Sequence, residues 1–304
     1  MSVTDRFCLL GTGNRVCYRT SGDPTGQLLI LIAGLTLDLT SWPMAMVDGL
    51  VDRGFYVIRL DNRDVGRSTW ATTKPPGLLR QLLGRPRRDG YDLDDMAADT
   101  VGLLDHLGVE RAHIVGMSMG GMIAQTVAAR YPDRVASLTS IFSTTGAARV
   151  GQPALSTRRL FARPAARTRE QFIARHVDLM RHIAGLGFPL DEAAAVDYAA
   201  GAWERGPGPI AGSGVARQIN AILKSGDRTE ELRNVTAPTA VINGDHDLIV
   251  HPSGGRATAA AIPGAHHVTI AGMGHDIAAG VVDRIVDLIA RTAHRRTLAE
   301  VGRS

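Results

Sequence analysis

The sequence predicts one α/β domain: a mainly parallel sheet covered by helices on both faces, with a helical cap inserted between two strands. Short apolar runs alternate with helical patterns through most of the chain, an order that gives parallel strands joined by covering helices. The alternation breaks between residues 144 and 231, where the pattern is helical and rich in Arg. We therefore assign residues 1–143 and 232–304 to an α/β core and residues 144–231 to the cap. The 304 residues, 44% of them apolar, suffice for one full core.

The strands are expected at short, continuous apolar runs, which are typical of strands buried on both faces. Residues 7–19 are expected to form a hairpin around a turn at 11–14. The later strands are expected at 28–33, 55–60, 112–116, 135–140, 239–243 and 265–270.

The helices are expected where apolar residues recur at helical spacing between a capping residue and a stop signal. Ser41 and Asp92 have the side chains of helix N-caps, and Gly54 and Gly108 are the matching stops. The expected helices of the core therefore cover 41–54, 92–108, 119–130, a stretch ending near 263, and 281–292.

Composition and charge exclude several classes of protein. The net charge of +4 is spread without a basic stripe, so we expect no nucleic-acid partner. The longest apolar run, 28–33, is too short to span a bilayer, and the first residues lack a signal-peptide core. We therefore expect a cytoplasmic protein without stable membrane insertion. Whether it forms homo-oligomers stays open.

Two cysteines, Cys8 and Cys17, lie at equal distances from the turn of the expected hairpin. If the hairpin places them opposite each other, they are close enough for a disulfide. The alternative is a pair of reduced thiols, which is the usual state in a cytosolic protein.

The strongest motif is GMSMGG at residues 116–121, a G-x-S-x-G pattern between an expected strand and an expected helix. A sharp strand-to-helix turn lifts the side chain of Ser118 out of the sheet, and the flanking glycines are needed because a Cβ would collide with the turn. The N–H of Met119 begins the helix and points at a substrate oxygen with the helix dipole behind it. The motif therefore predicts Ser118 as a nucleophile. No G-x-x-x-x-G-K-[ST] phosphate loop competes with it.

A serine nucleophile needs a base that is itself oriented by an acid, and with this elbow the acid and then the base follow the serine along the chain. After the strand 239–243 comes GDHD at 244–247. We assign the acid to Asp247, because the G-x-x-D spacing leaves a short loop that turns the carboxylate inward. Asp245 is the alternative acid.

The expected base is His275, which ends the segment GMGH at 272–275, directly after the last strand. His246 and His251 flank the acid loop and are its rivals. The His and Asp residues show no H-E-x-x-H zinc pattern, so we expect neither a metal nor a cofactor.

Four blocks, at residues 28–42, 61–69, 116–121 and 272–275, resemble those of α/β-hydrolases. The chain is most similar to bacterial esterases that resemble aclacinomycin methylesterase and to non-haem chloroperoxidase-like esterases. The resemblance covers nearly the whole chain and is weakest in the cap. It implies the α/β-hydrolase fold and an oxyanion hole made by the backbone N–H groups of Leu35 and Met119. The family usually has His-Gly where this chain has Ala33 and Gly34, so any hydrogen bond from that His is lost.

The resemblance implies a serine esterase acting through an acyl-enzyme on a small to medium apolar ester. Thioester, lactone or carbon–carbon bond hydrolysis and perhydrolysis are alternatives in the same pocket. Absence of the His-Gly-Gly-Pro loop argues against a proline iminopeptidase, and Ser118 argues against relatives with an Asp nucleophile. A ligand-binding receptor on the same fold is disfavoured by the complete triad. A dinucleotide oxidoreductase is disfavoured because AGLT, not G-x-G-x-x-G, follows the strand 28–33.

Two segments offer candidates for substrate specificity. In the cap, aromatic and apolar side chains either hold its helices on the core or line an apolar site. These are Phe161, Phe172, Met180, Phe188, Tyr198 and Trp203. The connection 69–91 is long, and its leucines at 78, 79, 82 and 83 lie among several Arg on one face of an expected short helix. We interpret it as a second flap, with a solvated loop as the alternative.

Overall fold

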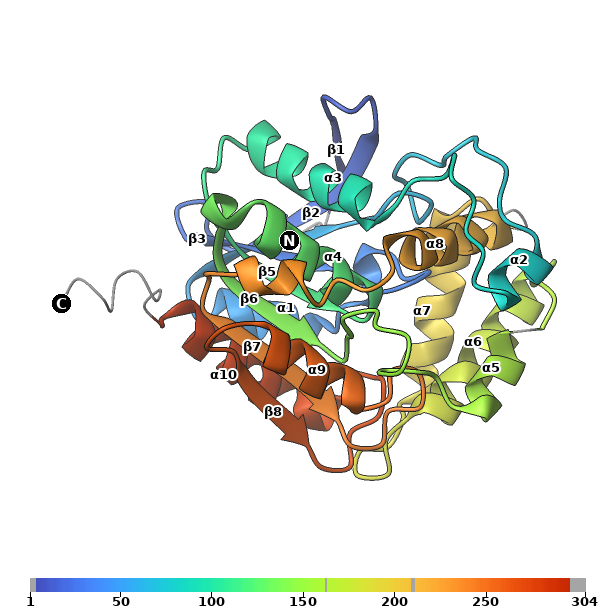
Figure 1. Cartoon of the computed structure of the whole chain (residues 1–304). Coiled ribbons are helices and arrows are strands. Elements are labelled where there is room, and N and C mark those ends of the chain that lie inside the picture. The colour runs from blue at the N-terminus through green and yellow to red at the C-terminus, as the bar shows by residue number, and fades with distance from the viewer. Residues whose placement is uncertain (1–3, 162, 209–210, 296–304) are drawn as a thin grey trace.

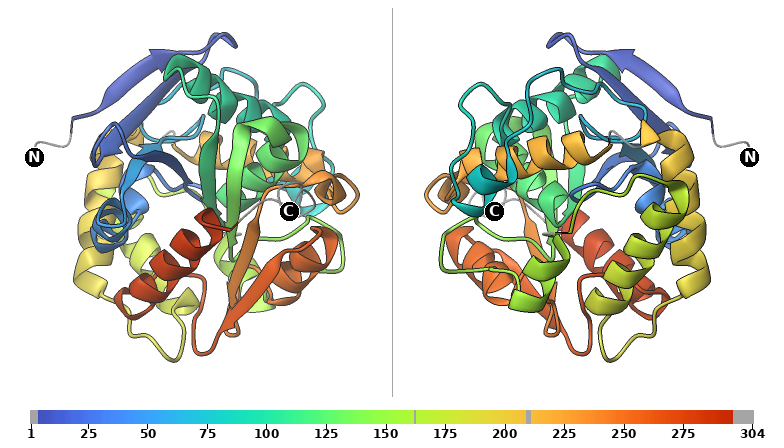
Figure 2. Two further views of the ribbon diagram at one scale, coloured as in Figure 1. Left: turned by 90° about the vertical axis from the view of Figure 1, so that its left-hand side faces the viewer. Right: turned by 90° about the vertical axis from the view of Figure 1, so that its right-hand side faces the viewer.

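The computed structural model describes residues 4–161, 163–208 and 211–295. Its centre is an eight-stranded sheet in the order β1-β2-β4-β3-β5-β6-β7-β8 (Figure 1). The strands are β1 (Arg6–Leu9), β2 (Arg15–Ser21), β3 (Gln27–Ile32), β4 (Phe55–Leu60), β5 (Ala112–Met117), β6 (Val135–Ile141), β7 (Thr239–Gly244) and β8 (His266–Ile270). β2 pairs antiparallel with β1 and β4, and the remaining pairs are parallel. The edge strands β1 and β8 lie far apart in both views of Figure 2.

The six strands expected after the hairpin are all present, and each begins and ends within one residue of its expected bounds. The reason is visible in β3, which is buried on both faces from Leu28 to Ile32. A strand covered on both sides needs a continuous apolar run, and such a run is readable from the sequence.

Helices of the core cover both faces of the sheet. α3 (Leu93–His106), α4 (Met119–Arg130) and α9 (Ser253–Ala261) pack on one face. α1 (Met44–Val51) and α10 (Val282–Ala293) pack on the other. The predicted α/β architecture is therefore confirmed.

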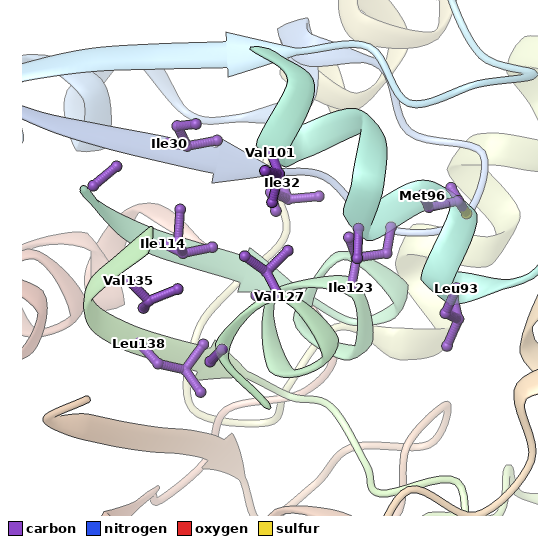
Figure 3. Packing of buried hydrophobic residues seen from close by; sticks show 14 of the residues in the cluster. Ile30, Ile32, Leu93, Met96, Val101, Ile114, Ile123, Val127, Val135 and Leu138 are labelled. Atoms are coloured by element: carbon purple, nitrogen blue, oxygen red, sulfur yellow. The ribbon is translucent and has the colours of Figure 1, made fainter. Parts of the chain in front are cut away.

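The apolar cluster on the α4 face fixes the position of that helix. Ile123 and Val127 of α4 belong to the same buried cluster as Ile30 of β3, Ile114 of β5 and Val101 of α3 (Figure 3). Each of these side chains is buried, and full burial of such a side chain stabilises the fold by about 1.5–3 kcal/mol. The helix α4 is thereby held against β3 and β5.

The helix starts test the expected capping residues. Asp92 caps α3 as expected, and its carboxylate forms a reciprocal capping box with Asp95. The expected start at Ser41 was wrong, because α1 begins at Met44. The Ser41 hydroxyl instead donates to the carbonyl oxygen of Asp38, and a short 3-10 helix (Leu39–Ser41) occupies this stretch.

In the described part of this segment, four α-helices follow one another between β6 and β7 and gather on one side of the molecule (Figure 1). They are α5 (Leu155–Phe161), α6 (Arg169–Ile183), α7 (Glu192–Arg205) and α8 (Ala211–Ser225). We call them the cap helices; the domain bounds 144 and 231 stay a prediction. In the described ranges, no helix is both long and apolar enough to cross a membrane.

The disulfide hypothesis was wrong, since Cys8 and Cys17 are free and buried. The expected hairpin is present, but its register pairs Cys8 with Val16 and Phe7 with Cys17. A shift of one residue places side chains on opposite faces of the ribbon, so the two sulfurs do not face each other.

The connection 69–91 contains a five-residue helix, α2 (Leu78–Leu82), which lies against α8. Leu78, Leu79 and Leu83 are exposed, Leu79 to 70%. These three leucines therefore do not anchor the segment to the core, and its role as a flap stays a prediction.

Candidate active site

Ser118 lies in a sharp turn between the end of β5 and the first residue of α4. Its backbone has φ 55° and ψ −122°, an unusual conformation for a residue with a side chain, which costs on the order of 1–3 kcal/mol. Its N–H donates to the Ile141 carbonyl (2.9 Å), and its carbonyl accepts from the Ser143 hydroxyl (2.8 Å) and from the Met122 N–H (3.2 Å).

The glycines around Ser118 are required by close backbone contacts. A Cβ on Gly116 would lie 2.1 Å from the Gly120 carbonyl oxygen, and a Cβ on Gly120 would lie 2.0 Å from that of Ile32. A Cβ on Gly121 would lie 2.6 Å from Ser143 Cβ. The motif expected to form a tight elbow therefore does so for the steric reason given.

His275 follows β8 and contacts Ser118: its Nε2 lies 3.0 Å from Ser118 Oγ. His275 is buried, and its imidazole packs against the Phe142 ring, with the ring centroids 4.4 Å apart. Its backbone N–H donates to the carbonyl of Ile183 in α6 (3.0 Å). A Cβ on Gly274 would lie 2.1 Å from the same oxygen, which explains why glycine precedes the histidine.

Asp247, in the loop after β7, contacts the far side of the imidazole. Its Oδ2 lies 2.7 Å from His275 Nδ1. Its Oδ1 accepts the backbone N–H groups of Ile249 and Val250, both at 2.8 Å. The buried carboxylate is therefore held at both oxygens and presents one of them to the histidine.

The alternative acid and bases lie elsewhere. The half-exposed Asp245 carboxylate accepts the N–H of Gly272 (2.7 Å). His246 is exposed next to Asp245, and the exposed His251 lies 2.9 Å from the Ser253 hydroxyl. Of the candidates predicted from sequence, the structure thus brings together Ser118, His275 and Asp247.

The two expected oxyanion donors belong to the first turn of α4 and to the loop after β3. Met119 is the first residue of α4, where an N–H has no acceptor within the helix. Leu35 follows β3, and in the described part of the chain its N–H has no hydrogen-bond acceptor. A Cβ on Gly34 would lie 3.1 Å from Ser118 Cβ, so this loop lies directly against the nucleophile.

Sequence reasoning missed a side chain that supports this loop. The buried Asn62 donates through Nδ2 to the carbonyl oxygen of Ala33 (3.0 Å). It thus holds the loop at Ala33, directly before Gly34. In the sequence, Asn62 is marked only by its place in the block at 61–69, and nothing in that block indicates a contact with Ala33.

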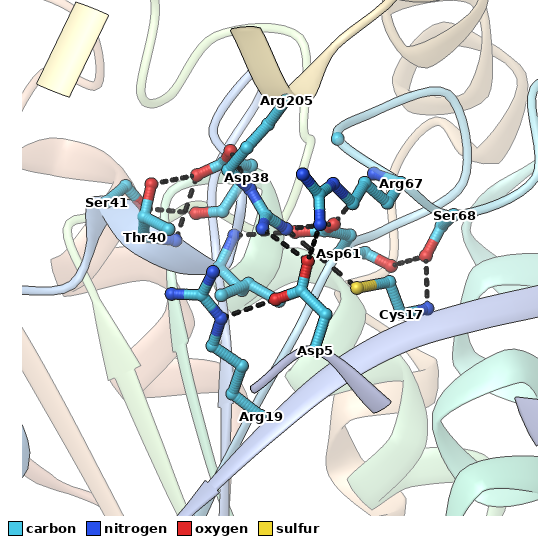
Figure 4. Close-up of polar contacts among 12 residues, drawn as sticks. Asp5, Cys17, Arg19, Asp38, Thr40, Ser41, Asp61, Arg67, Ser68 and Arg205 are labelled. Atoms are coloured by element: carbon cyan, nitrogen blue, oxygen red, sulfur yellow. Dashed lines mark hydrogen bonds and ion pairs between the residues drawn. The ribbon is translucent and has the colours of Figure 1, made fainter. Parts of the chain in front are cut away.

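A buried ionic cluster includes Asp38 of the loop that follows β3 (Figure 4). Arg205, at the end of α7, contacts Asp5, Asp38 and Asp61 at 2.7, 2.8 and 2.7 Å. Burial raises the pKa of the Asp61 carboxyl, and the charge of Arg205 opposes that rise. The cap helix α7 is thereby tied to the loop after β3.

A second buried arginine ties α8 to the loop after β4. Arg217 contacts both carboxylate oxygens of Asp64 (2.8 and 2.7 Å), and the Tyr91 hydroxyl donates to the same carboxylate (2.8 Å). Bidentate geometry makes such a pair strong and directional. Sequence reasoning missed both arginines because Arg in a helical segment usually faces water.

A cavity of about 60 Å³ lies between the core and the cap helices, next to the loop that carries Leu35. Phe172 and Trp203 line it from the cap, and Trp70 lines it from the connection 69–91. Tyr198 instead binds the backbone of Asp38, and Phe188 packs on the core. These cap aromatics therefore line the cavity or contact the core, and a role in substrate binding stays a prediction.

The strand–serine–helix elbow on this sheet defines an α/β hydrolase. Residues 27–279 match the family model described as the alpha/beta hydrolase fold, and the chain belongs to this family. The family predicted from the sequence blocks is therefore confirmed.

Two relatives and one solved structure illustrate the similarity. Rhodomycin D methylesterase DnrP of Streptomyces peucetius is 32% identical over 302 residues, covering 90% of this chain and 93% of that protein. DauP of Streptomyces sp. strain C5 has the same description, identity and coverage. The enol-lactonase from Burkholderia xenovorans LB400 superposes with a TM-score of 0.72 at 25% identity, covering 95% of this chain and all of that one.

Proposed function

We propose that the protein is a serine hydrolase of carboxylic esters, with Ser118 as nucleophile, His275 as general base and Asp247 as the acid that orients the base. The observation that carries the proposal is the continuous contact from Ser118 Oγ to His275 Nε2 (3.0 Å) and from His275 Nδ1 to Asp247 Oδ2 (2.7 Å). Ester chemistry is further supported by the two methylesterases, which match over nine tenths of this chain.

In the proposed reaction, Ser118 Oγ attacks the ester carbonyl carbon while His275 Nε2 takes its proton. The oxyanion binds the N–H groups of Leu35 and Met119. The proton on His275 passes to the alkoxide, which leaves as an alcohol, and the acyl group stays on Ser118. Water, deprotonated by His275, then releases the carboxylic acid. These steps use no metal or cofactor.

We propose a small to medium apolar ester as substrate, enclosed by a cap of residues 144–231. The aromatic lining of the cavity beside the Leu35 loop supports an apolar group. The methylesterase relatives support a small leaving alcohol. The enol-lactonase structure supports a lactone as second candidate, because a lactone is an ester within a ring and passes through the same acyl-enzyme.

The proposal is tested with p-nitrophenyl esters from acetate to dodecanoate, with a methyl ester of an aromatic acid and with an aryl lactone. Wild type is compared with Ser118→Ala and with Ser156→Ala, which removes the hydroxyl of an exposed serine in α5. We expect Ser118→Ala to lose at least about 10³-fold in kcat/KM. Ser156→Ala is expected to match wild type.

The chain-length profile then measures the size of the acyl site, and the methyl ester against the lactone separates the two substrate candidates. Equal turnover by wild type and Ser118→Ala contradicts the mechanism. A folded wild type that hydrolyses none of these esters and is not labelled by a fluorophosphonate contradicts the proposed function altogether.

A further inference from the structure

The loop that carries Leu35 contains a residue in an unusual conformation. Thr36 has φ 69°, in the left-handed region. The Leu37 N–H donates to the Gly34 carbonyl (3.2 Å), which closes a four-residue turn. Of its two central residues only Thr36 has positive φ, and this is the type II arrangement. That position favours Gly or Asn, so a β-branched Thr there costs on the order of 1–3 kcal/mol.

A lower-strain alternative exists for the same four residues. Type I and type II turns differ by rotation of the central peptide, here the one that joins Leu35 to Thr36. In the type I form Thr36 would have φ near −90°, a region that threonine adopts readily. The local sequence therefore favours the other turn, and a contact from outside the loop must hold the one observed.

That contact comes from Gln218 of α8, which is fully buried. Its Oε1 accepts the N–H of Thr36 (3.0 Å), and its Nε2 donates to the carbonyl of Arg63 (2.9 Å). Rotating the Leu35–Thr36 peptide would place a carbonyl oxygen opposite Oε1. Gln218 cannot adapt by turning its amide, because Oε1 would then face the Arg63 carbonyl.

The position of this turn matters for the reaction. Leu35 precedes the held peptide, and its N–H is the proposed second oxyanion donor. The loop lies directly against the nucleophile, as the 3.1 Å from a Cβ on Gly34 to Ser118 Cβ indicates. The Leu35 N–H belongs to the peptide before the one that rotates, so it is displaced only if the turn moves as a whole. Without the anchor from Gln218 to Thr36 the turn is free to relax, and a donor that must lie within about 3 Å of the oxyanion is no longer held in place.

We propose that Gln218 is a positioning residue for the oxyanion hole: from the cap helix α8 it holds the Leu35 turn in its type II form. The inference rests on the proposed function of Ser118 and Leu35. Because the oxyanion forms only in the transition state, Gln218 acts on kcat and leaves ground-state binding of the ester largely unchanged. The cap thus completes the catalytic site as well as covering it.

The test is a rescue experiment. Gln218→Met removes both hydrogen bonds at similar side-chain length, and we expect kcat for the best p-nitrophenyl ester to fall about 10- to 100-fold with KM within about threefold. Thr36→Gly alone is measured as the reference for the double variant. Combined with Gln218→Met it restores most of kcat, because glycine adopts positive φ without strain. Thr36→Ala, which keeps a Cβ, restores much less.

Two outcomes overturn the proposal. One is a Gln218→Met variant with unchanged kcat. The other is a loss that Thr36→Gly does not restore, which would mean that Gln218 only packs the cap onto the core. If Gln218→Met does not fold, the same comparison is made with the smaller Gln218→Ala. Failure of the proposed function gives a different result: wild type and Ser118→Ala would then hydrolyse the ester equally, before Gln218 is changed at all.

Discussion

Replacing Asp247 by Asn tests how the acid acts, because the structure dictates which way the new amide must face. The Oδ1 position lies 2.8 Å from two backbone N–H donors, those of Ile249 and Val250. An amide NH₂ there would oppose two donors, so the amide oxygen must take this place. The NH₂ group then faces His275 Nδ1.

A donor opposite Nδ1 forces the imidazole to place its own proton on Nε2, the nitrogen that must accept the proton of Ser118. The variant therefore keeps its geometry and loses its base. We expect kcat/KM for p-nitrophenyl acetate at neutral pH to fall by about 10⁴-fold, equivalent to about 5.5 kcal/mol of transition-state stabilisation. The free energy of unfolding is expected to change much less, since both backbone N–H groups keep their acceptor.

Asp245→Asn is the matched control and also tests the alternative acid. Its half-exposed carboxylate accepts one backbone N–H and does not contact His275. We expect its kcat/KM to stay within about threefold of wild type. Asp247→Asn with more than a tenth of wild-type activity, or a large loss in Asp245→Asn instead, would refute the assignment.

Three further predictions concern stability. Gly120→Ala places a Cβ 2.0 Å from a backbone oxygen of β3, and we expect it to lower the free energy of unfolding, measured in urea, by about 3 kcal/mol. The control is Gly201→Ala, inside α7, where a Cβ has nothing within 4 Å; we expect it to raise the free energy of unfolding by up to about 1 kcal/mol. Arg205→Met leaves the buried carboxylates of Asp38 and Asp61 without a cationic partner and is expected to cost about 3–5 kcal/mol at pH 7, and less at pH 5. Arg67→Met, which removes a half-exposed guanidinium, is expected to cost at most about 1 kcal/mol. Burial lowers the pKa of His113 to about 4, so between pH 7 and pH 4 the unfolded chain binds a proton at this histidine that the folded chain does not bind. The free energy of unfolding is therefore expected to fall by about 3 kcal/mol over this range, and His113→Gln is expected to lose this part of the pH dependence.

Each of these predictions has a contradicting outcome. Equal effects of the two Gly→Ala changes would mean that the elbow relaxes around a Cβ. The pH dependence of Arg205→Met follows from burial, which raises the pKa of Asp61, so that a proton neutralises it as the pH falls. A loss that grows toward pH 5 would contradict this reasoning. For His113, the same loss of unfolding free energy between pH 7 and pH 4 in wild type and in His113→Gln would mean that carboxylates alone cause that loss.

Much of the candidate site was readable from sequence because its signals are local. Ser118 lies inside a six-residue motif, and the glycines that its turn requires are within three residues of it. His275 and Asp247 were found by position, since parallel strands bring the loops at their carboxyl ends to the same edge. The strands after the hairpin were predicted correctly because short apolar runs mark them, and such a run is also a local pattern.

The missed residues act over long separations. Gln218 and Thr36 are 182 positions apart, and Arg205 and Asp61 are 144 apart. In a helical pattern such polar residues look like a solvated face, and only the docking of the cap helices shows that they are buried. The pairing of Cys8 with Val16 in the β1–β2 hairpin was missed because the register depends on how the turn closes. A shift of one residue leaves the sequence pattern unchanged.

The central claim, that Ser118 is a nucleophile that forms an acyl-enzyme, is tested most directly by mass spectrometry of the intact protein after reaction with a fluorophosphonate, followed by peptide mapping. The account predicts one adduct per chain in wild type, located on Ser118, and none in Ser118→Ala. It also predicts much slower labelling of Asp247→Asn, because the base that activates the serine is lost. An adduct on another residue, or equal labelling of Ser118→Ala, would contradict it.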